Sequence, residues 1–347
     1  MMFFIFKNFE LKNTTGERVV KVKKHTPDKI RNVGIIAQSG AGKTTLMEAL
    51  LYRAGEINRL GRVDQSNTVS DYTDYEKERK SSIFLSLGNF VHNNVKVNLM
   101  DTPGYQDFIG EIVSAARVAD AAIAPVDALS GFGTGSIQAL SYMNDKPVVF
   151  FINKIEKDNA DFQKVFDEIG ESVSGTLVPF SYPIGVGTEF KGIVDVLKMK
   201  AYSYADDGKA QEIDMPGSVD VDSLREQLVE AAAETDEALM EKYFEEGELT
   251  DEEIIKGLKQ GIMKGDIKPV YVGSAYQAKG VNILMDAIVE LLPSPADMPV
   301  EMGKPNTVSE DEISIDLSAD APFSAFVFKT VNDPHLGSIN YLRIYSG

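Results

Sequence analysis

The sequence predicts an α/β fold in which helices cover both faces of a mostly parallel central sheet. Short apolar runs of strand length alternate with segments of helical periodicity, an arrangement typical of parallel strands joined by crossover helices. A glycine-rich run stands between the first of these strands and the first helix, which is where such folds bind phosphate groups. The chain has 347 residues and is 43% hydrophobic, so it can fill more than one core.

The main domain is expected to begin with an apolar strand at 33–36, followed by a helix at 44–54. Residues 95–99 alternate between apolar and polar, which predicts a half-buried strand, and helical spacing returns at 108–119. The remaining elements are two apolar strands and a final strand with its helix, at 121–126, 148–152, 270–272 and 281–291. We assign all of these elements to one domain formed by residues 31–169 and 269–295.

The stretch between the two halves has a different texture and predicts an inserted α+β subdomain at 170–268. Prolines and glycines separate short β-like runs that end near Tyr204. One long acidic helix is expected next, because apolar residues recur on one side of it from Leu224 to Tyr243. Residues 250–253, Thr-Asp-Glu-Glu, have the pattern of a capping box and predict the start of another helix.

The two ends of the chain fall outside these units. Residues 1–30 are expected to form a solvated arm with a small basic cluster at 21–25, and 296–320 an acidic linker. The last stretch, 321–347, predicts two strands joined by a turn at Asp333 and Pro334. Because two strands do not make a stable domain alone, we expect the chain to stop inside a β domain or to continue further.

The composition excludes several classes of protein. Lys and Arg total 35 and Asp and Glu total 53, a net charge of −18, which argues against a generic basic nucleic-acid binder. A local basic patch could still contact RNA. There are no cysteines, so disulfides, thiolate metal sites and thiol nucleophiles are excluded. No apolar run approaches the roughly 20 residues that cross a bilayer, and the apolar opening at 1–6 is too short for a signal peptide.

Residues 37–44, Ala-Gln-Ser-Gly-Ala-Gly-Lys-Thr, have the pattern of a phosphate-binding loop. The glycines let successive backbone N–H groups curl around phosphate oxygens, and the following helix adds the positive end of its dipole. Lys43 is expected to reach the β- and γ-phosphates, and the Thr44 hydroxyl to coordinate Mg²⁺. The pattern follows an apolar strand and precedes a helix, which is the context that this loop requires.

Three further motifs follow the other predicted strands. Residues 101–104, Asp-Thr-Pro-Gly, supply an aspartate for Mg²⁺ and a Gly104 amide close to the γ-phosphate. Residues 153–156, Asn-Lys-Ile-Glu, end a third strand where a base-reading loop is expected, and Ser274-Ala275 end a fourth. Because the carboxyl ends of parallel strands meet at one edge of a sheet, the four motifs should converge there. Their order along the chain is that of a GTPase.

On these motifs the chain resembles the translational GTPases, and elongation factor G and its paralogues most closely. The resemblance covers nearly everything from residue 31 to 347. Other runs that look like that family are Leu51–Gly55, Gly192–Asp195, Lys198–Ala201, Leu239–Tyr243, Gly273–Ala275 and Leu292–Pro295. It implies a P-loop GTPase domain interrupted by the family's insert and followed at 321–347 by the start of a β-barrel second domain.

The resemblance also implies partners and cofactors. The full protein would bind GTP and GDP with Mg²⁺, act as a cytoplasmic monomer and contact the RNA and proteins of the ribosome. Its missing C-terminal domains would reach tRNA and mRNA, either moving them after peptide transfer or splitting ribosomes during recycling. The net negative charge is no obstacle, because a large RNA can be met by local basic surface and by shape.

Site residues are carried over from the family by position. The nucleotide would be bound by Ala37, Gln38, Ser39, Gly40, Ala41, Gly42, Lys43, Thr44, Thr45, Asp101, Thr102, Pro103, Gly104, Asn153, Lys154, Glu156, Ser274, Ala275 and Tyr276. Mg²⁺ would be held by Thr44, Ser82 and Asp101, where Ser82 replaces the family's threonine and supplies an equivalent hydroxyl. Lys43, Gly104 and Tyr105 would lie at the reacting phosphate.

Two departures from the family pattern bear on chemistry. Tyr105 stands where the family has the histidine that positions the attacking water, and tyrosine is a poor proton acceptor. Gln106 is chemically suited to orient water but lies one position too far along. Glu156 replaces the aspartate that accepts hydrogen bonds from guanine N1–H and the 2-amino group. Its extra methylene should shift the carboxylate relative to the guanine edge, so that a preference for guanine remains but is weaker.

Three functions remain open on the sequence alone. The first is a ribosome-stimulated GTPase that drives translocation, and the second is a ribosomal factor that binds GTP but hydrolyses it slowly or not at all. The third is a ribosomal protection protein that ejects tetracycline, although the match of the insert at 184–201 favours elongation factor G. An unrelated ATPase is least favoured, because Asn153-Lys154 belongs to a guanine-reading loop.

Overall fold

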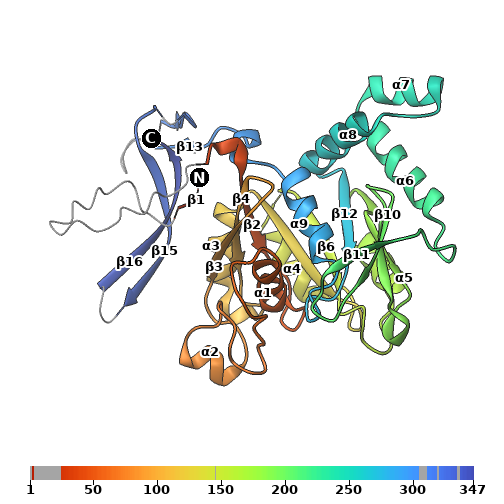
Figure 1. Cartoon of the computed structure of the whole chain (residues 1–347). Coiled ribbons are helices and arrows are strands. Elements are labelled where there is room, and N and C mark those ends of the chain that lie inside the picture. Colours follow the sequence, from red (N-terminus) through yellow and green to blue (C-terminus); the bar gives the residue numbers. More distant parts are fainter. Residues whose placement is uncertain (1, 4–24, 145, 305–310, 319, 334–336) are drawn as a thin grey trace, which may run out of the picture.

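The computed structural model describes residues 2–3, 25–144, 146–304, 311–318, 320–333 and 337–347. Its centre is a seven-stranded sheet in the order β3-β4-β2-β5-β6-β12-β7 (Figure 1). All neighbouring pairs in it are parallel except β3 with β4. The strands are β2 Ile30–Ile35, β3 Ser86–His92, β4 Val95–Asp101, β5 Ala121–Asp127, β6 Val148–Asn153, β7 Thr176–Pro179 and β12 Ile267–Val272. The predicted α/β class with a mostly parallel sheet is confirmed.

Helices cover both faces of this sheet. Helices α1 and α9 contact each other over β3 and β4, whereas α3, α4 and α5 lie on the other side (Figure 1). The helices of this domain are α1 Lys43–Arg53, α2 Asp74–Arg79, α3 Ile109–Val118, α4 Thr134–Ser141, α5 Phe162–Ser172 and α9 Val281–Glu290. Short 3₁₀ turns occur at Pro27–Lys29, Gln106–Phe108, Gly187–Glu189 and Pro295–Asp297.

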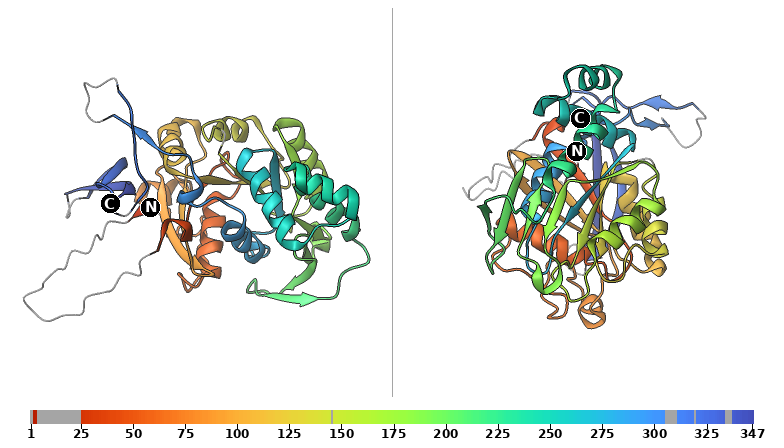
Figure 2. Two further views of the ribbon diagram at one scale, coloured as in Figure 1. Left: turned by 90° about the horizontal axis from the view of Figure 1, so that it is seen from above. Right: turned by 90° about the vertical axis from the view of Figure 1, so that its right-hand side faces the viewer.

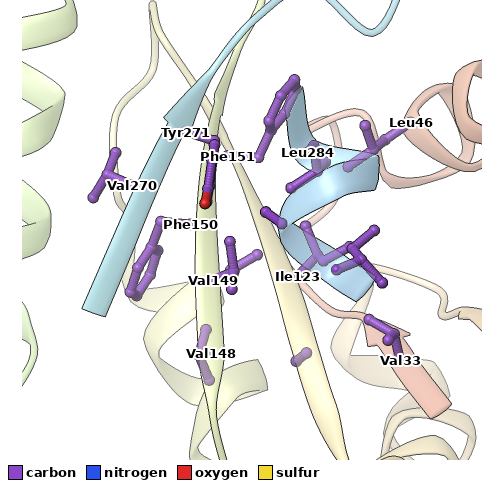
Figure 3. Packing of buried hydrophobic residues seen from close by; sticks show 14 of the residues in the cluster. Val33, Leu46, Ile123, Val148, Val149, Phe150, Phe151, Val270, Tyr271 and Leu284 are labelled. Atoms are coloured by element: carbon purple, nitrogen blue, oxygen red, sulfur yellow. The ribbon is translucent and has the colours of Figure 1, made fainter. Parts of the chain in front are cut away.

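The core lies between the sheet and its helices. Successive side chains of β6, Phe150 and Phe151, point to opposite sides of the sheet, and both are almost fully buried (Figure 3). Leu46 of α1 and Leu284 of α9 pack on the Phe151 side. Burial on both faces explains why β5 and β6 are apolar up to their last residues, Asp127 and Asn153, rather than alternating.

The inserted part consists of a four-stranded antiparallel sheet and three helices. The sheet has the order β11-β10-β9-β8, with strands β8 Ser181–Ile184, β9 Gly192–Asp195, β10 Lys200–Tyr204 and β11 Ala210–Ile213. The helices are α6 Val221–Ala233, α7 Glu237–Glu246 and α8 Asp251–Lys264, at the far side of the molecule from the C-terminus (Figure 1).

Several boundaries differ from the predictions. The expected division at 169/170 falls inside α5, and β7 pairs with β12 in the central sheet, so the chain leaves that sheet only after Pro179. The prediction of a single long acidic helix was wrong: two helices, α6 and α7, occupy that stretch, because Asp236 caps the second with its side chain. The capping box at Thr250 is confirmed, since Thr250 and Glu253 exchange the expected hydrogen bonds.

The C-terminal stretch forms a long antiparallel hairpin, β15 Ser324–Asp333 and β16 Gly337–Ser346. Part of the expected turn, including Pro334, lies outside the described residues, as does most of the N-terminal arm with the basic residues 21–24. The arm is not entirely separate from the fold, because β1 Met2–Phe3 pairs with β16, and β2 already begins at Ile30. The linker contains a small pair, β13 Met302–Gly303 and β14 Ile313–Ser314.

The hairpin packs beside α3, opposite the insert across the central sheet (Figure 2). A buried ion pair joins them: Arg343 of β16 lies 2.6 Å from Asp120, at the end of the connection from α3 to β5. Arg343 also donates to the carbonyl of Val118, the last residue of α3. No helix among the described residues is long and apolar enough to span a membrane.

Candidate functional site

The glycine-rich loop connects β2 to α1 in the conformation that its sequence requires. Gly40 and Gly42 both have φ in the left-handed region, at 83° and 96°. A Cβ on Gly42 would lie only 2.4 Å from Nδ2 of Asn153, so the close approach of the base-reading strand also requires glycine there. The loop therefore presents backbone N–H groups at the start of α1, as a phosphate cradle does.

Lys43 is folded back over this loop. Its ammonium donates to the carbonyls of Ala37 and Gln38, both at 2.9 Å. Burial lowers the pKa of Lys43 to about 8, although the nearby carboxylate of Asp101 opposes that shift. The lysine thus lies at the predicted phosphate position with only neutral acceptors, and an anion there would be a better partner.

The three predicted Mg²⁺ ligands lie together. The Thr44 hydroxyl donates to Oδ2 of Asp101 at 2.7 Å and lies 2.9 Å from the Ser82 hydroxyl. Burial raises the pKa of Asp101 to about 7. The other oxygen of Asp101 is buried and has no hydrogen-bond partner among the described residues. Such an unsatisfied buried oxygen is costly by itself, and it suits a site completed by a cation.

Asp71 joins this group and was missed by the sequence analysis. Both of its carboxylate oxygens are buried without a hydrogen-bond partner in the described structure, and burial raises its pKa. In the sequence, Asp71 is marked only as a carboxylate in a loop eleven positions before Ser82. Carboxylates in loops are too common for this to indicate a cation site. Among the described residues, no three His, Asp or Glu side chains form a metal cluster, so a cation here would need hydroxyls, water and phosphate as further ligands.

The Asp-Thr-Pro-Gly turn closes one side of the cradle. The Thr102 hydroxyl donates to the carbonyl of Ile35 at 2.8 Å, and Ser39 N–H donates to the Gly104 carbonyl at 3.1 Å. A Cβ at position 104 would lie 2.4 Å from Ser39 N and 2.5 Å from Lys43 Nζ. Glycine is therefore required here by space, since a larger residue would push the turn off the phosphate loop.

Tyr105 lies at the outer edge of this turn and is 46% exposed. Gln106, the other residue considered for orienting water, donates its side-chain amide to Gln138 of α4. It is thus held by a neighbour across the surface rather than directed at the turn. Neither side chain reproduces a buried imidazole beside the γ-phosphate position, and the three histidines of the chain, His25, His92 and His335, belong to other segments of the sequence.

At the base end, Asn153 ties three motifs together. Its Nδ2 donates to the Ala41 carbonyl at 3.0 Å, and its Oδ1 accepts from the N–H groups of Lys154 and Ala275, both at 2.9 Å. Lys154 has a left-handed φ of 65°, and its ammonium bonds Asp127 at 2.6 Å and the Gly40 carbonyl at 2.8 Å. Strain at such a residue is typical of functional sites.

Glu156 lies in the same loop with both carboxylate oxygens buried and without a partner in the described structure. Tyr276, 45% exposed, follows Ala275, and the guanidinium of Arg62 lies 3.6 Å from its ring centroid. Arg62 also donates to the Tyr276 carbonyl. Sequence reasoning did not find Arg62, because nothing in its local pattern marks it as part of the site.

The predicted residues thus gather at the carboxyl ends of β2, β4, β6 and β12, on one edge of the sheet. Comparison with known families identifies the arrangement: residues 28–294 match the model of the elongation factor Tu GTP binding domain. The chain belongs to this family. It is therefore a P-loop GTPase domain of the translational class, and such a domain binds guanine nucleotides.

A solved structure supports the same family. A crystal structure of a protein from Thermus thermophilus is 33% identical to this chain and superimposes with a TM-score of 0.81. The match covers 92% of this chain and 46% of that one, so the chain spans about half the length of its relative. The family match supports the resemblance to translational GTPases, whereas it does not distinguish elongation factor G from its paralogues.

Proposed function

We propose that this chain is the nucleotide-binding part of a ribosome-associated translation factor like elongation factor G. Two groups of side chains carry this proposal. Thr44, Asp101 and Ser82 are hydrogen-bonded at one end of the site. Asn153 and Lys154 are hydrogen-bonded at the other end, in the same loop as the buried, unpartnered carboxylate of Glu156. A guanosine phosphate with its cation offers partners for both ends. Residues 321–347 would then begin the β-barrel second domain, and further domains would meet tRNA and mRNA.

The residues at the phosphate end fit Mg²⁺. Thr44 and Ser82 would supply hydroxyl oxygens, and Asp101 and Asp71 carboxylates would act directly or through water. The cation would neutralise charge that develops on the phosphates. Lys43 would exchange its two carbonyl acceptors for phosphate oxygens, and the Gly104 N–H would lie beside the terminal phosphate.

The residues at the base end fit guanine rather than adenine. The buried and unpartnered carboxylate of Glu156 needs hydrogen-bond donors, and guanine presents two of them side by side, N1–H and the 2-amino group. Adenine offers no such pair on that edge and would leave the carboxylate unsatisfied. The structure of the loop therefore supports a preference for GTP and GDP.

Isothermal titration calorimetry with GDP, GTP and ATP, each with and without Mg²⁺, tests the assignment. We expect Mg²⁺-dependent binding of both guanine nucleotides, and ATP binding at least about tenfold weaker. Lys43→Ala should weaken the binding of both guanine nucleotides. Glu156→Asp should tighten GDP binding by roughly 1–2 kcal/mol if the shorter carboxylate restores two good hydrogen bonds. Equal or tighter binding of ATP would refute the guanine assignment.

A second function from a different class is favoured by Tyr105. Its exposed side chain offers no proton acceptor suited to the attacking water, so the factor would bind GTP and hydrolyse it slowly or not at all. GTP would then act as an ordering ligand on the ribosome rather than as fuel. A tetracycline-type protection protein is the remaining alternative, and the insert that includes β8, β9 and β10 favours elongation factor G over it.

A further inference from the structure

The backbone that follows Ser82 is held by two carboxylates from different helices. Ile83 and Phe84 both donate their N–H groups to Oε1 of Glu76, at 3.1 Å each. The next N–H, that of Leu85, donates to Oε2 of Glu111 at 2.6 Å. Three successive N–H groups are therefore fixed by charged acceptors, and such hydrogen bonds are about twice as strong as neutral ones.

Each carboxylate is itself held in place. Glu76, fully buried in α2, uses its second oxygen to accept from the N–H and the hydroxyl of Thr73, at 3.2 and 2.7 Å. This capping box makes Glu76 part of a closed local unit. Glu111 lies in the first turn of α3, which follows the Asp-Thr-Pro-Gly turn after Tyr105 and a short 3₁₀ turn. It has no comparable local partner among the described residues and is instead paired with a residue far along the chain.

That partner is Lys329 of β15, in the C-terminal hairpin. Its ammonium donates to Oε2 of Glu111 at 3.1 Å and to the carbonyl of Leu85 at 2.6 Å. It also lies 5.4 Å from the ring of Phe84. The side chain of Lys329 is only 8% exposed, so its charge depends on these partners. Lys329 thus contacts both the carboxylate that holds the backbone and the backbone itself.

We propose that Lys329 is a positioning residue for Ser82, acting through Glu111 and Leu85. The inference rests on the proposed function, in which Ser82 contributes to the Mg²⁺ site. Docking of the hairpin fixes Leu85, Glu76 holds Ile83 and Phe84, and the two anchors together set the position of the Ser82 hydroxyl beside Thr44. The coupling is reciprocal by thermodynamic necessity, so occupancy of the Mg²⁺·GTP site must tighten the docking of β15 in turn.

The test compares nucleotide binding by the whole 347-residue chain and by three variants: Lys329→Met, Lys329→Arg and Lys256→Met. Lys256 lies on α8, in the insert, and serves as the matched control. GTP and GDP affinities are measured by fluorescence with Mg²⁺ and with EDTA. Lys329→Met should weaken Mg²⁺-dependent GTP binding about five- to twentyfold and leave affinities in EDTA unchanged within about twofold. Lys329→Arg should recover most of the loss, and Lys256→Met should match the unmodified chain.

A second measurement uses the unmodified protein and does not depend on how a variant folds. Amide hydrogen exchange along β15 should slow with Mg²⁺·GTP relative to GDP, because the coupling works in both directions. If the unmodified chain binds no guanine nucleotide, the proposed function fails. Suppose instead that the unmodified chain binds GTP with Mg²⁺. Only the role of Lys329 is then refuted if Lys329→Met lowers the affinity for all nucleotides equally or not at all, or if amide exchange in β15 is the same with GTP and with GDP.

Discussion

Replacing Arg343 should loosen the C-terminal hairpin more than any exposed substitution. The Arg343 guanidinium and the Asp120 carboxylate are 6% and 1% exposed and lie 2.6 Å apart. Asp120 also accepts a bond from Asn32 Nδ2 at 2.8 Å, and Arg343 donates to the Val118 carbonyl at 2.6 Å. Arg343→Met keeps most of the apolar stem but removes every donor, so the buried Asp120 carboxylate keeps only its neutral partner Asn32, and the Val118 carbonyl loses the Arg343 hydrogen bond.

Breaking one side of a buried pair typically costs about 3–5 kcal/mol, because the remaining charge stays in a poorly solvated place. Urea denaturation of the full chain, followed by circular dichroism, should show a loss of that size in the free energy of unfolding for Arg343→Met. Changing Asp120→Asn in the same chain removes the stranded charge and should recover at least about 1 kcal/mol of the loss. Lys200→Met, which breaks an exposed pair with Glu212, should leave the midpoint unchanged.

Two results would contradict this reasoning. A loss below about 1 kcal/mol for Arg343→Met would mean that water reaches Asp120 once the guanidinium is gone. A double variant with Asp120→Asn that is less stable than Arg343→Met alone would mean that the stranded charge is not the origin of the loss.

Three further predictions concern the site and the insert. Under the proposed function, Tyr105→His should raise ribosome-stimulated GTP hydrolysis by about 10²–10⁴-fold and leave the affinity for GDP unchanged. Hydrolysis by the unmodified protein at the rate of an ordinary elongation factor would contradict this expectation. Gly104→Ala places a methyl group 2.5 Å from Lys43 Nζ, so the affinity for GTP, measured by calorimetry, should fall about tenfold. An unchanged affinity would show that the turn can shift freely. Burial raises the pKa of Asp195 to about 6. Because this carboxyl ionises near pH 4 in the unfolded chain, the cost of its charge is absent below that pH, grows up to about pH 6 and is complete above it. Asp195→Asn should therefore raise the free energy of unfolding by about 3 kcal/mol at pH 8 and hardly at pH 4, and an equal effect at both values would contradict the assignment.

The elements that the sequence predicts well are those whose signals are local. The strands β5 and β6 and the second half of β2 are mostly apolar because they are buried on both faces, and the phosphate loop has a fixed spacing of glycines and lysine. The break between α6 and α7 was missed because apolar residues continue in helical register across it. The Asp236 cap that ends the register is visible only once the backbone is known.

The residues around the cation site were predicted in part. Thr44, Ser82 and Asp101 belong to motifs, whereas Asp71, Glu76 and Glu111 are carboxylates among the chain's 53. Asp71 and Glu76 are distinguished by burial, and Glu76 and Glu111 by the N–H groups that they face, and both are properties of tertiary structure. Lys329 is more distant still, since its role arises from a contact across 218 positions of the chain.

The place of β7 has a consequence for the order in which this molecule assembles. Within the central sheet β7 pairs with one strand, β12. Because residues 180–266 separate the two strands, β12 is synthesised only after all of that segment. During synthesis β7 therefore stays unpaired until β12 inserts between β7 and β6. Because this pairing joins strands far apart in the sequence, it should be slow. The length of the intervening segment has little effect on the free energy of folding, because doubling the length of such a loop costs only about 0.6 kcal/mol. A change in the size of the insert should therefore alter the stability of the fold little, whereas the late pairing of β7 leaves Val178 and Pro179, buried in the folded protein, uncovered until β12 has been made.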